Sequence, residues 1–271
     1  MRQARAIALT FVLALGVKAA DPAPNTLTAD ERAAGWILLF DGKTMNGWRD
    51  PRRMEPPGDA WTIADGAIQA VAKPRIVEDL FTEENWRDFE FQWDWRISRA
   101  GNSGVKYRIQ KTVWLTGEHP KLPGFEQEVE WFVQHPAPER PVRGQNYVIG
   151  FEYQMIDNKL NEDALAGKSH STAALYDMVA PTEDATKPAG EWNHSVLKVD
   201  GDHTVHWLNG VKVVDTSLAP ADIQPLLQKR WGKTPGVFSL LGDQPRRDCP
   251  ISLQNHDAAT WFRNLKIRRL L

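Results

Sequence analysis

The chain of 271 residues has very little cysteine and no excess of one charge. Cys249 is the single cysteine, so an internal disulfide is excluded, and the sequence has no Cys/His cluster with the spacing of a structural zinc site. There are 33 lysine and arginine residues against 35 aspartate and glutamate residues, which gives a formal net charge of -2. Without a basic excess the chain has no electrostatic footprint for nucleic acid, and we exclude that class of partner.

Long apolar runs are also scarce. The longest, residues 6–17, follows Arg2 and Arg5, precedes a small-residue site at residues 17–19, and is too short to span a bilayer comfortably. This arrangement is typical of a secretory signal. We therefore expect a signal peptide at residues 1–20, a linker and short helix at residues 21–34, and a single domain at residues 35–271. The mature protein should have no transmembrane segment and should be periplasmic or extracellular.

Tryptophan, in contrast, is abundant, with 12 residues against 4 tyrosines and 10 phenylalanines. Indole rings fill the cores of β-sandwiches, and they also stack on the apolar faces of sugar rings. The count therefore permits a carbohydrate site without requiring one, and a core position is the commoner case for any one ring.

From residue 27 onward the hydrophobic pattern has mostly a period of two, with turn signals between short aromatic and β-branched runs. This pattern predicts an antiparallel β-sandwich or barrel. The predicted strands are residues 37–40, 61–63, 67–70, 89–98, 104–109, 147–155, 195–200, 204–208, 211–216, 235–241, 251–255 and 261–268. Short helices are expected only at residues 28–35 and 220–231, and residues 110–146 and 161–188 are expected to be long functional loops.

Three predicted strands carry polar side chains two residues apart, and such residues share one face of a strand. A solvated sheet face explains any single pair. If the sheets curve, however, the polar face becomes a groove in which these groups converge on a polyhydroxylated ligand. The pairs are Lys106 with Arg108, Glu152 with Gln154, and Gln254 with His256.

One acidic segment suggests a different chemistry. Glu126, Glu128 and Glu130 would share one face of a strand, as the carboxylates of laminarinase-type glycoside hydrolases do. That strand usually has a central aspartate and apolar residues between the carboxylates. Glu128 and Gln127 depart from both features, so a charged edge strand is the better interpretation.

Seven short motifs are spread along the chain, at residues 39–48, 61–67, 102–108, 150–157, 191–193, 253–256 and 262–264. Together they resemble the 3-keto-disaccharide hydrolase domain family. The resemblance runs from about residue 35 to the C-terminus, and the order and spacing of the motifs make it specific. It implies a concanavalin A-like, laminarinase-like β-sandwich (jelly roll) that is usually exported and acts on sugars oxidised at carbon 3.

A 3-keto sugar, the substrate that the resemblance implies, can be cleaved by elimination. A carbonyl at carbon 3 acidifies the proton on carbon 2, so a base can remove it, the enolate expels the group on carbon 1, and water then adds back. Such a site needs a base, a cation or metal that stabilises the enolate oxygen, and an acid for the leaving group. The resemblance also implies a partner, the oxidoreductase that makes the 3-keto sugar.

The candidate residues follow from these requirements. His256 or Glu152 is the candidate base, and Arg108 or Lys106 is the candidate enolate stabiliser. The candidate hydroxyl binders are Asn102, Gln154 and Gln254. No spacing rule in the sequence demands a cofactor, and a divalent metal ion held by Glu152, Asp157 or His256 is an open alternative.

Two other functions compete with this one. The first is a non-catalytic, lectin-like carbohydrate-binding module, because the same sandwich serves both roles. A binder needs exposed tryptophan platforms, whereas an enzyme needs an ionisable group with a perturbed pKa in the groove. The second is a two-carboxylate endoglycosidase, which requires Glu126 and Glu130 to face a cleft about 5 to 5.5 Å apart.

Overall fold

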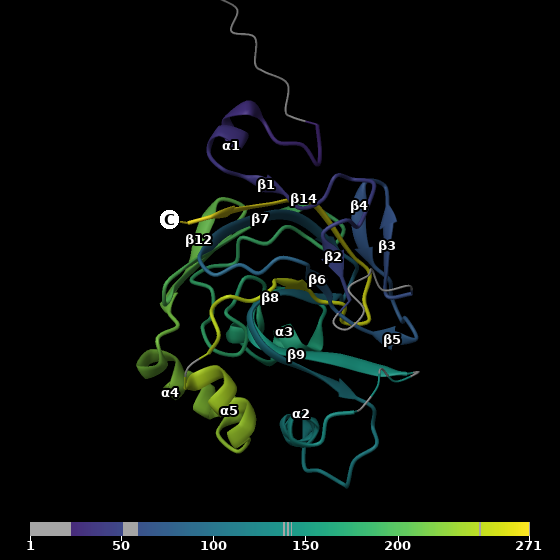
Figure 1. The fold of residues 1–271 in the computed structure, drawn as a ribbon, viewed down its shortest axis with the longest axis vertical. Coiled ribbons are helices and arrows are strands. Elements are labelled where there is room, and N and C mark those ends of the chain that lie inside the picture. The colour runs from purple at the N-terminus through teal and green to yellow at the C-terminus, as the bar shows by residue number, and fades with distance from the viewer. Residues whose placement is uncertain are drawn as a thin grey trace, which may run out of the picture.

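The computed structural model describes residues 23–50, 59–137, 139, 141, 143–243 and 245–270. Two mainly antiparallel sheets pack face to face, which confirms the predicted β-sandwich (Figure 1). The predicted signal segment lies outside the described residues. Within the described part of the chain, no helix is long and apolar enough to cross a membrane.

The first sheet has eight strands in the order β12-β11-β10-β7-β14-β4-β3, with β1 paired to β14. Two turns of the type Asp-Gly or Asn-Gly join β10 to β11 and β11 to β12, as the sequence predicts. The strands are β1 (Ile37–Leu38), β3 (Trp61–Ala64), β4 (Ala67–Ala70), β7 (Phe89–Ile97), β10 (Asn193–Asp200), β11 (His203–Leu208), β12 (Val211–Ser217) and β14 (Thr260–Arg269).

The second sheet has six strands in the order β2-β6-β13-β8-β9-β5. Its centre is the long antiparallel pair β8 and β9, which begins and ends well outside the predicted limits. The strands are β2 (Trp48–Arg49), β5 (Ile76–Val77), β6 (Leu80–Thr82), β8 (Asn102–Leu115), β9 (Gly144–Ile156) and β13 (Ser252–Leu253).

Helices are more numerous than the one or two predicted. The helices are α1 (Ala29–Ala33), α2 (Phe125–Gln134), α3 (Glu162–Ala166), α4 (Pro220–Trp231), α5 (Pro235–Gly242) and a short 3-10 helix, η1 (Lys168–His170). The first and the fourth agree with the prediction. Helices α2, α4 and α5 lie together on the side of the six-stranded sheet that faces away from the sandwich interior, while α1 lies at the opposite end of the molecule (Figure 1).

Two of these helices correct predictions. Residues 235–241 form α5 rather than a strand, because a short apolar run fits either structure and Pro235 at the first helical turn favours the helix. The segment at residues 110–146 is not one loop, since β8 continues to Leu115 and α2 and the start of β9 follow.

The space between the sheets is filled mainly by aromatic side chains. Seven of the tryptophans are buried, and Trp93 stacks on Phe91 at 4.8 Å and meets the edge of Tyr153 at 5.0 Å between ring centres. A buried hydrogen bond joins the two sheets, because Tyr153 Oη on β9 lies 2.9 Å from Ser195 Oγ on β10, which also accepts from Trp95 Nε1 of its own sheet. The tryptophan excess therefore serves the core.

Candidate active site

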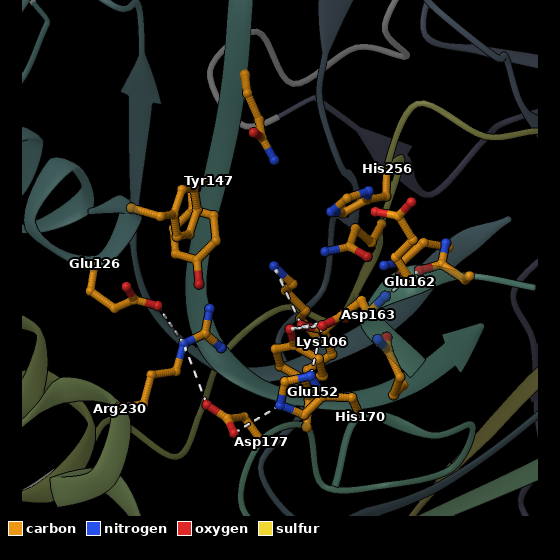
Figure 2. A pocket seen from close by; sticks show the side chains of 17 residues that line it. Lys106, Glu126, Tyr147, Glu152, Glu162, Asp163, His170, Asp177, Arg230 and His256 are labelled. Carbon is orange, nitrogen blue, oxygen red and sulfur yellow. Dashed lines mark hydrogen bonds and ion pairs between the residues drawn. The ribbon is translucent and has the colours of Figure 1, made fainter. Parts of the chain in front are cut away.

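A polar cavity of about 690 Å³ lies on the outer face of the six-stranded sheet. Strands β8, β9 and the segment after β13 supply its floor, and the loop after β9, α2 and α4 supply its walls (Figure 2). The lining residues are Asn102, Lys106, Phe125, Glu126, Gln145, Tyr147, Glu152, Gln154, Asn161, Glu162, Asp163, His170, Tyr176, Asp177, Arg230, Gln254 and His256.

The floor is built around Lys106 and Glu152. These residues are direct partners in the β8–β9 pairing, and residues paired in this way present their side chains on one face. Lys106 Nζ lies 3.8 Å from Glu152 Oε2 and donates a hydrogen bond of 3.3 Å to the carbonyl of Val148. The Gln254 amide bridges the pair, accepting from Lys106 Nζ and donating to Glu152 Oε1 at 3.2 Å each.

Gly104 makes room for the Glu152 carboxylate. A Cβ atom at this position would lie 2.2 Å from Glu152 Oε1, closer than any real contact. The glycine is therefore required by the close approach of a side chain from the neighbouring strand rather than by a turn.

A second carboxyl, Asp79, lies beside this pair and is buried. Ser252, the cross-strand partner of Lys106 on β13, donates from Oγ to Asp79 Oδ2 at 2.9 Å. Burial raises the pKa of Asp79 to about 7, against the opposing influence of the Lys106 ammonium. Burial would lower the pKa of Lys106, but the carboxylates of Glu152 and Asp79 outweigh it and raise that pKa. Lys106 is thus held as a cation in a buried position.

One wall of the cavity holds an imidazole between two carboxylates. His170 Nδ1 lies 2.6 Å from Asp163 Oδ1, and His170 Nε2 lies 3.0 Å from Asp177 Oδ1. Partial burial would lower the pKa of His170, but the hydrogen bonds to Asp177 and Asp163 outweigh it and raise that pKa. Tyr176 Oη also donates to Asp163, at 3.1 Å.

A cationic side chain, Arg230, adjoins this wall. Arg230, in the last turn of α4, has its Nε 3.4 Å from Glu126 Oε1 and 3.9 Å from Asp177 Oδ2. Its guanidinium also lies over the ring of Tyr176, at 5.1 Å. Figure 2 shows Arg230 and Glu126 on the side of the cavity opposite His256.

The structure brings most of the sequence-predicted residues into this one cavity. Besides Lys106, Glu152 and Gln254, it contains Asn102, Gln154 and His256. The buried Oδ1 of Asn102 has no hydrogen-bond partner among the described residues, so it is available to a ligand hydroxyl. His256 is exposed at the rim.

Arg108 is not among the residues that line this cavity, and this corrects the prediction that it shares a face with Lys106. The β8–β9 register shifts between Tyr107 and Lys111, and Arg108 has a φ of 48°. The resulting bulge breaks the alternation of side chains. The Arg108 guanidinium instead donates to the carbonyl of Gly201 and, at 3.3 Å, to Asp202 Oδ1.

Asp157 also lies apart from the cavity lining, and the residues do not fit the predicted metal site. Its carboxylate accepts hydrogen bonds from the backbone amides of Ala100, at 2.9 Å, and Lys159, at 3.1 Å. Glu152 and His256 line the cavity without it. In the described part of the chain, no group of three or more His, Cys, Asp or Glu side chains is placed to hold a metal ion.

The two-carboxylate alternative is wrong for a structural reason. Glu126 and Glu130 lie on helix α2 rather than on a strand, and Glu130 does not line the cavity. Both Glu130 oxygens accept hydrogen bonds, of 2.9 Å each, from the amides of Gly236 and Val237. Glu130 therefore caps the first turn of α5, where a negative charge is favoured.

Sequence reasoning missed the wall residues Asp163, His170, Tyr176, Asp177 and Arg230. The first four lie in the long segment after β9, which has no hydrophobic period that would place a side chain. Arg230 lies on a helix that the sequence predicts, and a basic residue in its last turn has an ordinary explanation in the helix dipole. The expectation that long loops are functional was the one available signal.

Comparisons with known proteins identify relatives of this chain. The model of a family described as the 3-keto-alpha-glucoside-1,2-lyase-like domain matches residues 35–268. A 3-keto-disaccharide hydrolase of Bacteroides thetaiotaomicron is 30% identical, covering 99% of this chain and 89% of the relative. A crystal structure of a candidate glycosyl hydrolase from Parabacteroides distasonis superimposes with a TM-score of 0.69 at 27% identity, covering 92% of this chain and 100% of the other. A second protein of that organism, with a TM-score of 0.54 and 24% identity over 87% of this chain and 99% of the other, shares the fold.

Proposed function

Because the chain belongs to the 3-keto-alpha-glucoside-1,2-lyase-like family, we propose that it cleaves 3-keto glycosides by removing the proton on carbon 2. One observation carries this proposal: a buried ammonium and a carboxylate lie 3.8 Å apart at the floor of a polar cavity. In a 3-keto sugar the acidic carbon is bonded directly to the carbonyl carbon. The base and the group that stabilises the enolate oxygen must therefore be close neighbours, as Lys106 and Glu152 are.

The steps assign one role to each group. Glu152 takes the proton from carbon 2, Lys106 stabilises the negative charge on the oxygen at carbon 3, and the bond from carbon 1 to the leaving oxygen breaks. The leaving oxygen takes a proton from His256. Water then adds to carbon 1, Glu152 returns its proton to carbon 2, and His256 takes the proton that the water loses. The net reaction is hydrolysis, and no oxocarbenium ion is formed.

The other groups of the cavity bind the sugar or hold the site in place. Asn102, Gln154 and Gln254 present amides to hydroxyl groups, and the exposed ring of Phe125 offers an apolar surface to the sugar. Both nitrogens of His170 are engaged by carboxylates. We therefore assign His170 to positioning the wall rather than to moving a proton.

A lectin-like binder is the second candidate, and the burial of the tryptophans disfavours it. The aromatic residues that line the cavity are phenylalanine and tyrosine, while seven tryptophans are buried elsewhere. The cavity instead holds a buried lysine, Lys106, whose pKa is raised by Glu152 and by Asp79 against the effect of burial. Asp79 itself lies behind the cavity lining, and burial raises its pKa to about 7. Perturbed ionisable groups in a cavity are more typical of enzymes than of binders.

The test is release of the aglycone from a chromogenic 3-keto glucoside, measured beside the unoxidised glucoside. We expect release from the keto sugar alone. Lys106→Met should lower kcat about 100- to 1,000-fold, the usual cost of losing an oxyanion-stabilising donor. Lys111→Met is the matched control, because Lys111 lies on the same strand but binds the carbonyl of Val133 and does not line the cavity. Equal release from both sugars would contradict the elimination mechanism, and binding without release would favour the lectin.

Two further expectations belong to this proposal. A 3-keto substrate must be made by oxidation of a hydroxyl at carbon 3, so a sugar oxidoreductase has to act before this enzyme. The second expectation is that the reaction takes place in the periplasm or outside the cell, and the signal-like residues 1–20 support it.

A further inference from the structure

The side chain of Tyr147 lines the cavity, although regular alternation along its strand does not predict this. Tyr147 and Glu152 lie five positions apart on β9, and residues separated by an odd number of positions point to opposite faces of a regular strand. The β8–β9 register shifts between these two positions. The irregularity that turns Arg108 away from the cavity therefore also lets Tyr147 face it.

The ring of Tyr147 is held by its neighbours, whereas its hydroxyl has no hydrogen-bond partner in the part of the chain that the structure describes. Lys106 Nζ lies 4.8 Å from the centre of the ring, and the Phe125 ring meets it edge-on at 5.2 Å. Figure 2 shows the hydroxyl pointing into the cavity on the side of Arg230.

The two cations beside the hydroxyl cannot take its proton. Lys106 and Arg230 both interact electrostatically with Tyr147, but ammonium and guanidinium groups only donate hydrogen bonds. The proton of the Tyr147 hydroxyl is therefore available to an acceptor atom of a ligand.

The order of the groups along the cavity matches the order of the carbons in the sugar ring. Figure 2 shows His256 and Tyr147 on opposite sides of Lys106 and Glu152. In the sugar, carbon 2 lies between carbon 1 and carbon 3. With His256 at the oxygen on carbon 1 and Glu152 at carbon 2, the oxygen on carbon 3 lies toward Tyr147.

We propose that the Tyr147 hydroxyl is a catalytic hydrogen-bond donor to the oxygen on carbon 3, which it holds together with the Lys106 ammonium. This inference rests on the proposed function, in which Glu152 removes the proton from carbon 2. The electron pair of the broken C–H bond moves into the bond between carbons 2 and 3, and the oxygen on carbon 3 takes the negative charge. The hydroxyl keeps its proton, and its hydrogen bond strengthens as this charge develops.

Tyr147→Phe tests the proposal, because it removes the hydroxyl and keeps the ring that contacts Lys106 and Phe125. We expect kcat on the chromogenic 3-keto glucoside to fall about 100-fold, the usual cost of losing one oxyanion donor. KM should stay within about twofold, because the donor acts mainly in the transition state. The urea midpoint should not change. An unchanged kcat would overturn the proposal, and so would a raised KM at unchanged kcat, since the hydroxyl would then bind only the ground state.

Tyr153→Phe is the matched control, with the same chemical change on the same strand. Its hydroxyl lies in the core, 2.9 Å from Ser195 Oγ, and donates to the carbonyl of Trp207 at 3.0 Å. This variant should have a lower urea midpoint and a kcat within about twofold of wild type. If Tyr147→Phe behaved like this control, its hydroxyl would be structural and the proposal would be wrong.

Hydrogen exchange at carbon 2 separates failure of this proposal from failure of the proposed function. In D2O, methyl 3-keto glucoside exchanges the proton on carbon 2 each time the enolate forms and is reprotonated, and NMR follows this exchange. We expect the wild type to catalyse exchange and Tyr147→Phe to slow it about as much as it slows kcat. If the wild type catalyses neither exchange nor release, the proposed function is wrong and this inference fails with it. If the wild type is active and Tyr147→Phe exchanges at the same rate, this inference alone is overturned.

Discussion

At the scale of single residues, the ionisation of Asp79 links the site to the stability of the protein. Its pKa is raised to about 7 in the folded protein because it is buried, whereas an aspartate in the unfolded chain has its ordinary pKa of about 3.8. Between these two values the folded state holds a proton that the unfolded state has lost. The free energy of unfolding therefore falls as the pH rises from about 4 through 7.

Asp79→Asn tests this link. The asparagine keeps an acceptor for the Ser252 hydroxyl and cannot ionise. The free energy of unfolding of the variant should therefore lack the part of the pH dependence that comes from Asp79. From pH 5 to pH 8 we expect the wild type to lose on the order of 2–3 kcal/mol relative to the variant, measured by urea denaturation at both pH values. If the free energy of unfolding changed with pH by the same amount in both proteins, Asp79 would titrate in its ordinary range and the prediction would be wrong.

Gly104 and Glu152 give a second prediction at this scale. In Gly104→Ala the new Cβ must displace the Glu152 carboxylate, because it would lie 2.2 Å from Oε1. Since a misplacement of about 1 Å can cost about 100-fold, we expect a loss of kcat of about that size on the 3-keto glucoside. Gly167→Ala is the control, because its Cβ meets nothing within 4 Å and its φ of 173° suits any residue. Full activity in Gly104→Ala would argue against Glu152 as the base.

At the scale of elements, the sequence predicts the sheet floor of the site better than its walls. Alternation predicted that Glu152 and Gln154 share one face of their strand, and the pairing of β8 with β9 puts Lys106 directly opposite Glu152 on the neighbouring strand. The same rule failed at Arg108 because a bulge inserts residues that the partner strand does not match. A bulge depends on how a strand pairs with its neighbour, so the hydrophobic pattern of one strand does not predict it.

Helices α2 and α5 were missed for a related reason. Their short sequences fit a strand as well as a helix, and the choice is made by the contact between the two elements. Glu130 of α2 binds the amides of Gly236 and Val237 at the start of α5. An interaction between residues more than 100 positions apart cannot be read from the local pattern of either segment.

This contact gives a prediction at the element scale. Glu130→Ala leaves two amides of α5 without their charged acceptor and should lower the free energy of unfolding by about 2 kcal/mol. Glu130 does not line the cavity, so kcat on the 3-keto glucoside should stay within about twofold of wild type. Glu128→Ala, on the same helix and paired with His119, should cost less than about 1 kcal/mol. If Glu130→Ala lost kcat but kept the free energy of unfolding of the wild type, the result would favour the two-carboxylate mechanism.

At the scale of the whole molecule, the described N-terminal segment is tied to the sandwich. The backbone amide of Asn25 donates to Asn264 Oδ1 at 2.6 Å, and the amide of Asn264 donates to Asn25 Oδ1 at 2.8 Å. A third bond runs from Asn25 Nδ2 to the carbonyl of Gly66. The chain is thus anchored a few residues after the predicted cleavage site.

The position of this anchor, downstream of the predicted cleavage site, leads to the last prediction. Expressed from its full sequence in a bacterium, the protein should be recovered from the periplasm or the medium with a new N-terminus after Ala19 or Ala20. Intact-mass measurement and N-terminal sequencing identify that end. Because Asn25 lies downstream of the cut, the processed protein should keep the hydrogen bonds between Asn25 and Asn264. Recovery of the uncut chain from the cytoplasm would contradict export.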